Sequence, residues 1–451
     1  MTFGASTFFE DEFNRTAKGF FDGRPQKPGH LRENAFPPMN KFSLSEIRAA
    51  VQAFQREAER FLCDLIRFPS LPGKEQEAME CAAQRFAEVG EVERIPLTNA
   101  LREDKDYADP MPGIAYEGRS NLRVHVAGTG GGRSLLFNTH LDVVPPSEGQ
   151  EHPFEPSVEA NRAHGRGSCD AKGQVAALFT VLMVAKRLGM RLRGDVLAHL
   201  VVEEEVGGNG TLAMVRRGEK ADGCIVMEPT ELRILSSVRG SVWFRVICIG
   251  RPGHSGRIGD TVSALKMAIR TVEILEQYHA RLLASSRGIP LFDQFANPMP
   301  ILFGQLVTGD WPATAPVCAS LEGLLGFLPN RTRYQVMDEM RRALREGGDE
   351  WLRDHFTLDF TNRHDAHVLD PGHPLVTRLQ ACCREAAAPD EVSAMTSSCD
   401  SWFYNNQLCI PTVVFGPGSL RVAHSNEEQI ELGEIDEAAT ILALFLSDWC
   451  G

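Results

Sequence analysis

A histidine and an aspartate lie two residues apart where a hydrophobic run of the sequence ends. The segment 137–145 reads Phe-Asn-Thr-His-Leu-Asp-Val-Val-Pro and contains His140 and Asp142. In extended chain, residues i and i+2 share a face, so Asp142 can hold one ring nitrogen of His140 while the other nitrogen binds a metal. A surface loop that happens to carry both residues explains the pair equally well, so the pair alone does not distinguish a metal site from such a loop.

Asp170 lies in a loop punctuated by glycines, residues 165–173, which opens a predicted helix over residues 174–188. Its carboxylate is well placed to bridge two cations, because the glycines let the backbone approach closely. The alternative is an N-cap aspartate beside a solvated Lys172, which is the simpler interpretation of the loop alone. The spacing to His140 favours the metal interpretation.

Three adjacent acids, Glu203, Glu204 and Glu205, follow an apolar strand predicted over residues 196–202. Such carboxylates repel one another, so neutralising them needs cations or raised pKa values. Neighbours in extended chain point in opposite directions, so Glu204 and Glu205 cannot both be simple ligands of one ion. The simplest assignment is that one of the two is a metal ligand and the other is a general base. A solvated acidic loop is the alternative, but the preceding strand is too apolar for a solvated face.

Two further strand regions end in a candidate ligand. Glu228 follows the short run 224–227, and His424 follows the late strand region 412–418. Each is weak alone, because Glu before Pro is a common turn and a lone His is more often structural. The nitrogen and oxygen donor set suits paired zinc, cobalt or manganese ions, and its members are His140, Asp170, Glu205, Glu228 and His424.

The elements that must position these residues alternate along the chain. A capping-box pattern at Ser43 and Glu46 opens a predicted long helix that continues to about Pro69. Short apolar runs then alternate with helix patterns, which is typical of a parallel sheet covered by helices. From Arg239 the character changes to an edge-like strand, a helix over residues 263–279 and a strand over residues 320–328.

The sequence therefore predicts an α/β fold in which a mostly parallel, helix-covered sheet forms the catalytic domain and a small α+β unit is inserted into it. We divide the chain into an N-terminal arm (1–42), a first catalytic part (43–237), the inserted unit (238–357) and a second catalytic part (358–451). No function is assigned to the arm.

Composition excludes several functional classes. The chain has 451 residues, and 47 Lys and Arg against 60 Asp and Glu give a net charge of -13, the wrong sign for binding nucleic acid. No apolar run approaches the ~18–20 residues of a membrane span, and the N-terminus lacks a signal-peptide pattern, so we expect a cytoplasmic protein without a membrane partner. Eleven cysteines without a Cys-x-x-Cys pair predict free thiols.

The motifs resemble those of the di-zinc family that includes acetylornithine deacetylase, succinyl-diaminopimelate desuccinylase, aminoacylase and glutamate carboxypeptidase. The resemblance rests on five motifs in the same order and runs from about Ser43 to the C-terminus. It implies two divalent ions, with zinc favoured over cobalt or manganese, that Asp170 bridges. It further implies that His140 and Glu228 complete one site, and that Glu205 and His424 complete the other. Glu204 matches the family's general base, and Asp142 matches the carboxylate that orients the first ligand.

The same resemblance implies that the inserted unit is the lid and dimerisation domain of a homodimer. The segment 250–255 resembles the one whose histidine, here His254, enters the partner subunit's site and polarises the scissile carbonyl. A turn histidine on the lid surface is the alternative. Close kinship also implies a cis peptide between Asp170 and Ala171.

Two departures from the family concern the substrate. The family's Asn-x-Ile-Pro element reads Trp-Pro-Ala-Thr-Ala-Pro over residues 311–316, and Gly326 stands where many members carry a carboxylate-binding arginine. The candidate replacement cations are Arg239, Arg257 and Arg331. An apolar or aromatic substrate could use Trp243, Trp311 and Phe327.

The sequence thus predicts a metal-dependent hydrolase of a C–N amide bond in a small molecule, most like an N-acyl amino acid deacylase of the acetylornithine deacetylase type. A dipeptidase or exopeptidase, or a hydrolase of an unusual aromatic amide or amine, is the second hypothesis and uses the same metal centre. A non-catalytic, metal-stabilised binding protein is the third. The acid beside the ligand, Glu204, argues against it.

Overall fold

The structure is a computed structural model that describes residues 42–254, 256 and 258–451. Apart from Phe42, the predicted N-terminal arm lies outside these residues, and so does Arg257. The first helix, α2 (Leu44–Ile66), begins with the predicted capping box. Ser43 Oγ accepts a hydrogen bond from the backbone amide of Glu46, and the Glu46 carboxylate accepts one from the amide of Ser43. The predicted opening helix is therefore confirmed, and it ends before Pro69.

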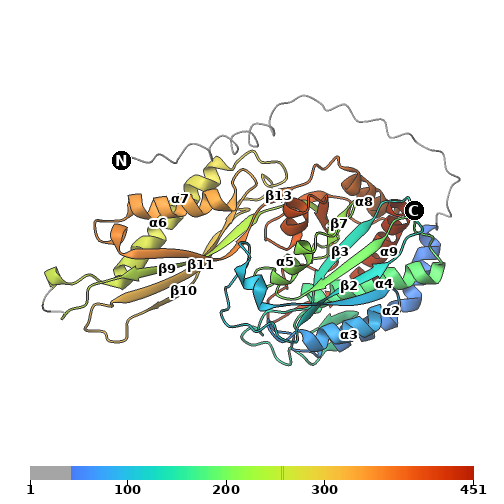
Figure 1. The fold of residues 1–451 in the computed structure, drawn as a ribbon, viewed down its shortest axis with the longest axis horizontal. Coiled ribbons are helices and arrows are strands. Elements are labelled where there is room, and N and C mark those ends of the chain that lie inside the picture. The colour runs from blue at the N-terminus through green and yellow to red at the C-terminus, as the bar shows by residue number, and fades with distance from the viewer. Residues whose placement is uncertain (1–41, 255, 257) are drawn as a thin grey trace, which may run out of the picture. The chain divides into compact units, whose positions relative to one another are not determined.

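A nine-stranded sheet lies at the centre of the larger part of the described chain (Figure 1). Its strands are, in order, β1 (Glu91–Pro96), β2 (Ser120–Val126), β6 (Val196–Val201), β3 (Leu135–His140), β7 (Cys224–Val226), β15 (Thr412–Val414), β8 (Ile234–Val238) and β13 (His367–Val368), and β14 (Val392–Met395) pairs with β8 outside this order. The central strands β6, β3, β7 and β15 are parallel. The strands β1, β2 and β13 pair antiparallel at the edges. The predicted α/β class is confirmed, with the parallel pairing at the centre.

Helices α2, α4 (Gly173–Leu188), α8 (Pro374–Glu385) and α9 (Leu432–Trp449) pack together, and α3 (Gln76–Phe86) packs beside α2. Their apolar faces form the main core, in which the rings of Phe61, Phe86 and Phe179 meet edge to face. Helix α5 (Asn209–Arg216) and the π-turn η5 (Phe403–Gln407) contact each other in a separate core. Among the described residues, the stretch Ser168–Leu188 alone is long and apolar enough to cross a membrane, but 94% of its most apolar window is buried, as in a core helix.

The segment of chain between β8 and β13 forms a separate four-stranded antiparallel sheet. Its order is β10 (Ile301–Thr308), β11 (Cys318–Phe327), β9 (Gly240–Ile249) and β12 (Phe356–His364). Helices α6 (Ala264–Ser285) and α7 (Arg333–Gly347) cover one face of it around a second core (Figure 1). The predicted boundary at residue 357 falls inside β12, which pairs with β9 from Phe356 to His364. We call residues 240–364 the insert.

A small third sheet connects two distant segments next to the candidate site. It contains β16 (Gln429–Glu431), β5 (Arg162–His164) and β4 (Ser157–Glu159), in that order. Pairing of β16 with β5 places the chain before β16 beside the glycine loop that follows β5. Short 3-10 turns complete the described elements: η1 (Asn99–Glu103), η3 (Ile258–Asp260) and η4 (Leu352–Asp354).

Candidate metal centre

The five predicted ligands come from loops at one edge of the nine-stranded sheet. His140 is the last residue of β3, Glu205 follows β6 and Glu228 follows β7. Because these strands are parallel neighbours, their carboxyl ends lie at the same edge. Asp170 lies in the π-turn η2 (Ser168–Lys172) that opens α4, and His424 lies in the loop between β15 and β16.

The two carboxylate oxygens of Asp170 face different histidines. Oδ1 lies 3.1 Å from Nε2 of His140, and Oδ2 lies 3.4 Å from Nε2 of His424. Glu228 Oε2 lies 3.9 Å from His140 Nε2, and Glu205 Oε1 lies 2.9 Å from His424 Nε2. The structure thus brings all five side chains together, with Asp170 between a His140 half that contains Glu228 and a His424 half that contains Glu205. The bond between Asp170 and Ala171 is cis, as expected from the resemblance.

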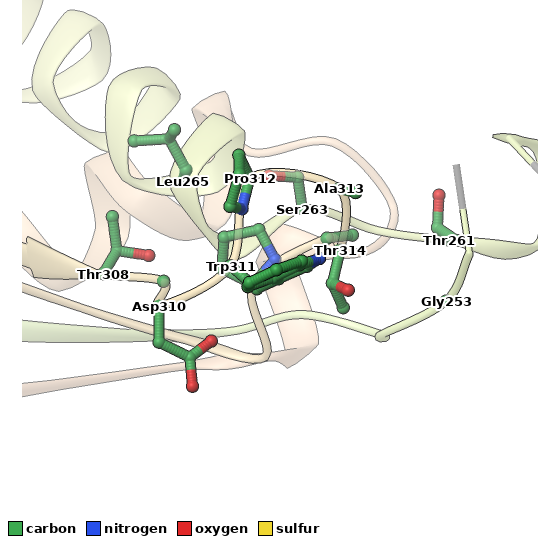
Figure 2. A pocket seen from close by; sticks show the side chains of 13 residues that line it. Gly253, Thr261, Ser263, Leu265, Thr308, Asp310, Trp311, Pro312, Ala313 and Thr314 are labelled. Carbon is green, nitrogen blue, oxygen red and sulfur yellow. The ribbon is translucent and has the colours of Figure 1, made fainter.

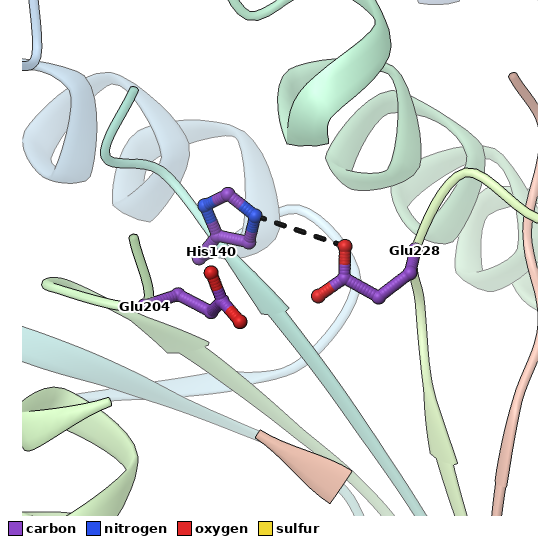
Figure 3. A group of neighbouring side chains, drawn as sticks. All are labelled: His140, Glu204 and Glu228. Atoms are coloured by element: carbon purple, nitrogen blue, oxygen red, sulfur yellow. Dashed lines mark ion pairs between the residues drawn. The ribbon is translucent and has the colours of Figure 1, made fainter. Parts of the chain in front are cut away.

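Glu204 belongs to the His140 half (Figure 3). One candidate ligand atom from each of His140, Glu204 and Glu228 lies within 4.8 Å of the other two, and Figure 3 shows both carboxylates turned toward the imidazole. Glu205 instead pairs with His424. The two adjacent acids lie in a turn and have different nearest partners, although a Glu205 oxygen also lies within 4.8 Å of candidate ligand atoms of His140 and Asp170.

Burial and mutual repulsion raise the pKa of three carboxyls in the cluster. Burial holds the pKa of Glu204 well above its ordinary value, and the charges of Glu228 and Asp400 add to the rise. Burial also raises the pKa of Glu228 and of Glu205, and the charge of Asp170 adds to both. The pKa of Asp170 is lowered, because hydrogen bonds from His140 and His424 outweigh the effect of burial. The cluster thus holds more negative charge than its own histidines neutralise.

Asp142 organises two parts of the cluster at once. Nδ1 of His140 lies 3.0 Å from the backbone carbonyl oxygen of Asp142 and 3.4 Å from its Oδ1, so the predicted contact is present and the shorter one is to the backbone. The same carboxylate accepts hydrogen bonds from the backbone amides of Glu204 and Glu205, at 3.1 and 3.0 Å. The sequence analysis did not find this second role, because the spacing of residues 140 and 142 says nothing of a loop 62 positions further on.

The third acid of the run, Glu203, is neutralised away from the cluster. Its carboxylate accepts hydrogen bonds from Arg119 Nη1 at 2.5 Å, from Tyr116 at 2.9 Å and from Asn209 at 3.0 Å. Arg119 also pairs with Glu75, and all of these side chains are buried. Of the three adjacent acids, only Glu204 and Glu205 therefore contribute a carboxylate to the cluster.

Glu428 is a buried residue beside the cluster that the sequence analysis did not identify. Its Oε1 accepts hydrogen bonds from the backbone amides of Gly167, Cys169 and Asp170, at 3.0, 3.2 and 3.2 Å. Its Oε2 pairs with the buried guanidinium of Arg166. Glu428 thereby holds the loop that carries Asp170. The sign of this residue in the sequence is a carboxylate four residues after His424. Its role can be recognised only when the pairing of β16 with β5 is known.

The remaining predicted site residues that the structure describes are not in the cluster. His254 is exposed, and its recorded contacts are within the insert: Nδ1 accepts a hydrogen bond from Gly256, and its backbone pairs with Thr314. Arg331 pairs with Glu339 at 3.1 Å in a depression between α6 and α7, so its charge is already neutralised. Arg239 is buried where the chain enters β9, and Arg257 lies outside the described residues.

The three aromatic candidates differ in exposure. Phe327 is fully buried, with its ring packed over Gly240, and its contact with a substrate stays a prediction. Trp243 lines a cavity of about 240 Å³ on the outer face of the insert, with Leu302 and Leu324. Trp311 is 66% exposed and lines a pocket of about 550 Å³ in the loop after β10, close in sequence to Thr314, which pairs with His254 (Figure 2).

The donor set fits divalent cations. Two imidazoles and three carboxylates, mostly buried and arranged on both sides of one aspartate, are the nitrogen and oxygen ligands that zinc, cobalt and manganese accept. Bound cations would neutralise the acids whose pKa burial raises. The second nitrogen of His140 contacts Asp142, the arrangement by which proteins orient a metal-binding imidazole.

Sequence comparison finds relatives over most of the chain. The profile of peptidase family M20/M25/M40 matches residues 136–448. N-formyl-4-amino-5-aminomethyl-2-methylpyrimidine deformylase from Bacillus subtilis (strain 168) is 28% identical over 367 residues, which cover 74% of this chain and 84% of the deformylase. Acetylornithine deacetylase from Vibrio atlanticus (strain LGP32) is 26% identical over 355 residues, which cover 77% of this chain and 89% of the deacetylase.

Solved structures show the same fold. The dipeptidase Dug1p from Saccharomyces cerevisiae aligns over 91% of this chain and 99% of its own, with a TM-score of 0.74 and 12% sequence identity. The YXEP protein of Bacillus subtilis, described as a dinuclear metal binding peptidase, aligns over 88% of this chain and 99% of its own, with a TM-score of 0.60 and 14% identity. At these identities the likeness concerns the fold alone.

Proposed function

The chain belongs to peptidase family M20/M25/M40 and is a metal-dependent amidohydrolase, and from this premise we propose that it removes the acyl group from a small N-acylated amino acid. The observation that carries the proposal is the cluster itself. Asp170 faces two histidines, each histidine faces a further carboxylate, and Glu204 lies beside them without being needed to complete either pair.

Two divalent ions, with zinc favoured, fit this arrangement. We assign His140 and Glu228 to one ion, His424 and Glu205 to the other, and Asp170 to both. Bound divalent ions lower the pKa of a water molecule and polarise a carbonyl group, which is the chemistry that amide hydrolysis needs.

Glu204 is the proposed general base. It accepts a proton from the attacking water and later donates that proton to the leaving nitrogen, so the C–O bond forms and the C–N bond breaks without a free charge on either. Burial and the charge of Glu228 raise the pKa of Glu204, which is the direction that a group returning a proton to the leaving nitrogen needs. Asp142 positions the base through the backbone amides of residues 204 and 205.

His254 is the proposed donor to the carbonyl oxygen, delivered by the insert of a second subunit in a homodimer. Its exposed position and its contacts within the insert agree with a role outside its own subunit's cluster. His254→Ala should lower turnover without lowering metal content. Mixing it with Glu204→Gln should restore part of the activity, because one site of the mixed dimer contains both groups. Failure of rescue after verified subunit exchange would remove this assignment.

Small acyl groups are the proposed preference. Gly326 offers no side chain for a second carboxylate, so a succinyl group would bury a charge with few partners. A relative named as a deformylase supports a formyl group, and a relative named as acetylornithine deacetylase supports an acetyl group. Dipeptides remain the second candidate, since a dipeptidase shares the fold.

A panel of N-formyl, N-acetyl and N-succinyl amino acids, aromatic formamides and dipeptides tests the proposal, with kcat/KM measured after loading with zinc, cobalt or manganese. We expect formyl or acetyl amino acids to be the best substrates. Succinyl-diaminopimelate as the best substrate would overturn the acyl preference, and dipeptides as the only substrates would replace deacylation by peptidase activity.

A further inference from the structure

A cavity of about 480 Å³ lies in the insert, beside the first residues of the edge strand β12. Its charged lining residues are Arg341 and Arg345 of α7 and Arg353 and Asp354 of η4. The volume falls within the range of small-molecule sites in proteins. Every lining residue belongs to the insert, whereas the five predicted metal ligands lie outside it. The cavity therefore shares no residue with the candidate metal centre.

The side chains that line the cavity give it a positive charge. Three guanidiniums and the one carboxylate of Asp354 leave a net charge of +2. Arg341 pairs with Asp338 at 3.2 Å, but the Asp338 side chain is 71% exposed and does not line the cavity. Among the described residues, no acid forms an ion pair with Arg345 or Arg353. Two cations beside one cavity thus remain available to an anion.

The insert does not share the acidic character of the rest of the chain. Residues 240–364 contain 14 Lys and Arg against 13 Asp and Glu, a net charge of +1, and the other residues contain 33 against 47, a net charge of -14. A field of that sign repels anions from the larger part of the protein. Elsewhere in the insert, arginines are paired with glutamates, as Arg245, Arg270 and Arg331 are.

The edge of β12 adds neutral donors to the guanidiniums. β12 is the last strand of its sheet, so within the described chain no strand pairs with it on the side away from β9. The amide of Ile249 donates to the carbonyl of His355 at 2.9 Å, and Phe356 faces Cys248. Alternate residues of an antiparallel strand bond to the partner strand, so the amides of Phe356 and Leu358 point away from β9. Both residues line the cavity.

The guanidiniums come from two elements that flank this edge. Arg341 lies over the ring of Phe360 in β12, 5.0 Å from its centroid, which orients the guanidinium beside the strand. Arg345 is four residues further along α7 and so lies on the same side of the helix. Arg353 belongs to the turn just before β12. Guanidiniums offer forked donors that match phosphate oxygens, and such charge-assisted hydrogen bonds are stronger than neutral ones.

We propose that this cavity binds the phosphate group of a small molecule, at a site distinct from the metal centre. Near neutral pH a phosphate monoester carries a charge of about -2, which balances the net charge of the cavity. The guanidiniums, the outward amides of β12 and the Thr357 hydroxyl are the donors to its oxygens. The proposal is independent of the proposed function, because no step of amide hydrolysis enters it.

Calorimetry with the metal-loaded enzyme tests the site, with inorganic phosphate and AMP as probes. At least one should bind with a Kd below about 1 mM, and higher ionic strength should weaken the binding. Tighter binding of AMP identifies an organic phosphate as the source of the group, and tighter binding of inorganic phosphate identifies the free ion. Adenosine, which lacks the charge, should bind at least about 10-fold more weakly than AMP. Malonate, a dicarboxylate of the same charge, should bind more weakly than inorganic phosphate. Binding of neither phosphate probe at about 1 mM, or tighter binding of malonate, would overturn the proposal.

Variants assign the binding to the arginines. Arg345→Gln and Arg353→Gln should each weaken binding of the better probe about 10-fold, the double variant should abolish it, and Arg345→Lys should recover part of the loss. Arg342→Gln is the matched control, because Arg342 is an exposed arginine of α7 that lines the depression between α6 and α7 instead. Unchanged affinity in the double variant would overturn the proposal.

Thermal unfolding separates binding from helix stability. Arg345 lies in the last turn of α7, where a cation also stabilises the helix. A bound ligand raises the unfolding temperature, so phosphate should raise that of the wild type and not that of the double variant. The same increase in both proteins would leave Arg345 a structural role only and would overturn the proposal. Arg353→Gln alone replaces the double variant if the latter does not fold.

Phosphate also binds divalent ions, so the metal centre needs its own control. His140→Ala, which should lower metal content, should bind the better probe as tightly as the wild type does. Loss of binding in His140→Ala, together with retained binding in the double arginine variant, would place the phosphate on the metal ions and overturn the proposal.

Discussion

The two halves of the cluster are built differently. In the His140 half, His140 is 1% and the Glu228 side chain 6% exposed, and both residues stand at the ends of central parallel strands. In the His424 half, the Glu205 side chain is 8% exposed but that of His424 is 49% exposed. His424 lies in a loop with a φ of 60°, a region that residues other than glycine rarely adopt.

One half of the cluster is therefore held by the sheet, and the other half is held by a loop. Asp142 fixes the ring of His140, whereas the backbone of His424 is held by a hydrogen bond from Ser147 Oγ to its carbonyl, at 2.6 Å. We therefore expect the two ions to bind with unequal affinity, the tighter one at His140.

The largest expected effect concerns Glu204, which lies in the buried half but is not assigned as a ligand. Glu204→Gln should lower kcat by about two to four orders of magnitude, because a positioned acid-base group contributes that much. Metal content, measured by elemental analysis, should stay at that of the wild type. Loss of the metals in this variant would make Glu204 a ligand and end the division between residues 204 and 205.

Substituting the histidine of each half in turn tests the expected difference in affinity between the two ions. His140→Ala should weaken the tighter ion by about 100-fold or more, since even outer partners of metal ligands contribute 10- to 100-fold. His424→Ala should weaken only the second ion and leave the first within a few-fold. Metal titration followed by calorimetry gives both constants, and the reverse order of effects would contradict the assignment of the tight site.

Glu428 should affect both halves alike, because it holds the loop of Asp170, the residue that we propose binds both ions. Glu428→Gln retains one oxygen for the backbone amides but loses the charge that pairs with Arg166. We expect about 10-fold weaker binding of both ions. Glu427→Gln, an exposed neighbour, is the control and should change neither constant. A loss confined to one ion would mean that Asp170 is not shared.

The smallest effect is expected from Ser147→Ala. Removing the hydrogen bond to the His424 carbonyl should weaken the second ion about threefold, within the range of one neutral hydrogen bond. Ser147 Oγ also accepts a hydrogen bond from Arg166 Nη2 at 2.8 Å, so the first ion should change, but by less than the second. Chelator titration of wild type and variant, with release of each ion followed separately, measures the difference, and a larger change in the first ion would refute the contrast between sheet and loop.

Much of the fold was predictable because its signals are local. The capping box at Ser43 and the apolar runs before His140, Glu205 and Glu228 indicate the helix and the strand ends directly. The positions of this histidine and these two acids at one edge then follow from parallel pairing.

The rest of the site depends on contacts between distant segments, which leave no local pattern. The pairing of Glu203 with Arg119 spans 84 positions, and the bond from Asp170 to Glu428 spans 258. The burial of Phe327 and the pairing of Arg331 with Glu339 are set by how the insert packs, and residue type alone did not distinguish them from surface groups.

Asp142 contacts both His140 and the amides of Glu204 and Glu205, and this affects how accurately these residues are positioned. A ligand and a base that were anchored to separate parts of a protein would each carry their own positional error, and the errors would add. Here the ring of His140 and the amides of Glu204 and Glu205 all contact Asp142, so a small displacement of that residue shifts them together. The spacing between His140 and the proposed base Glu204 is thus kept when the surroundings relax.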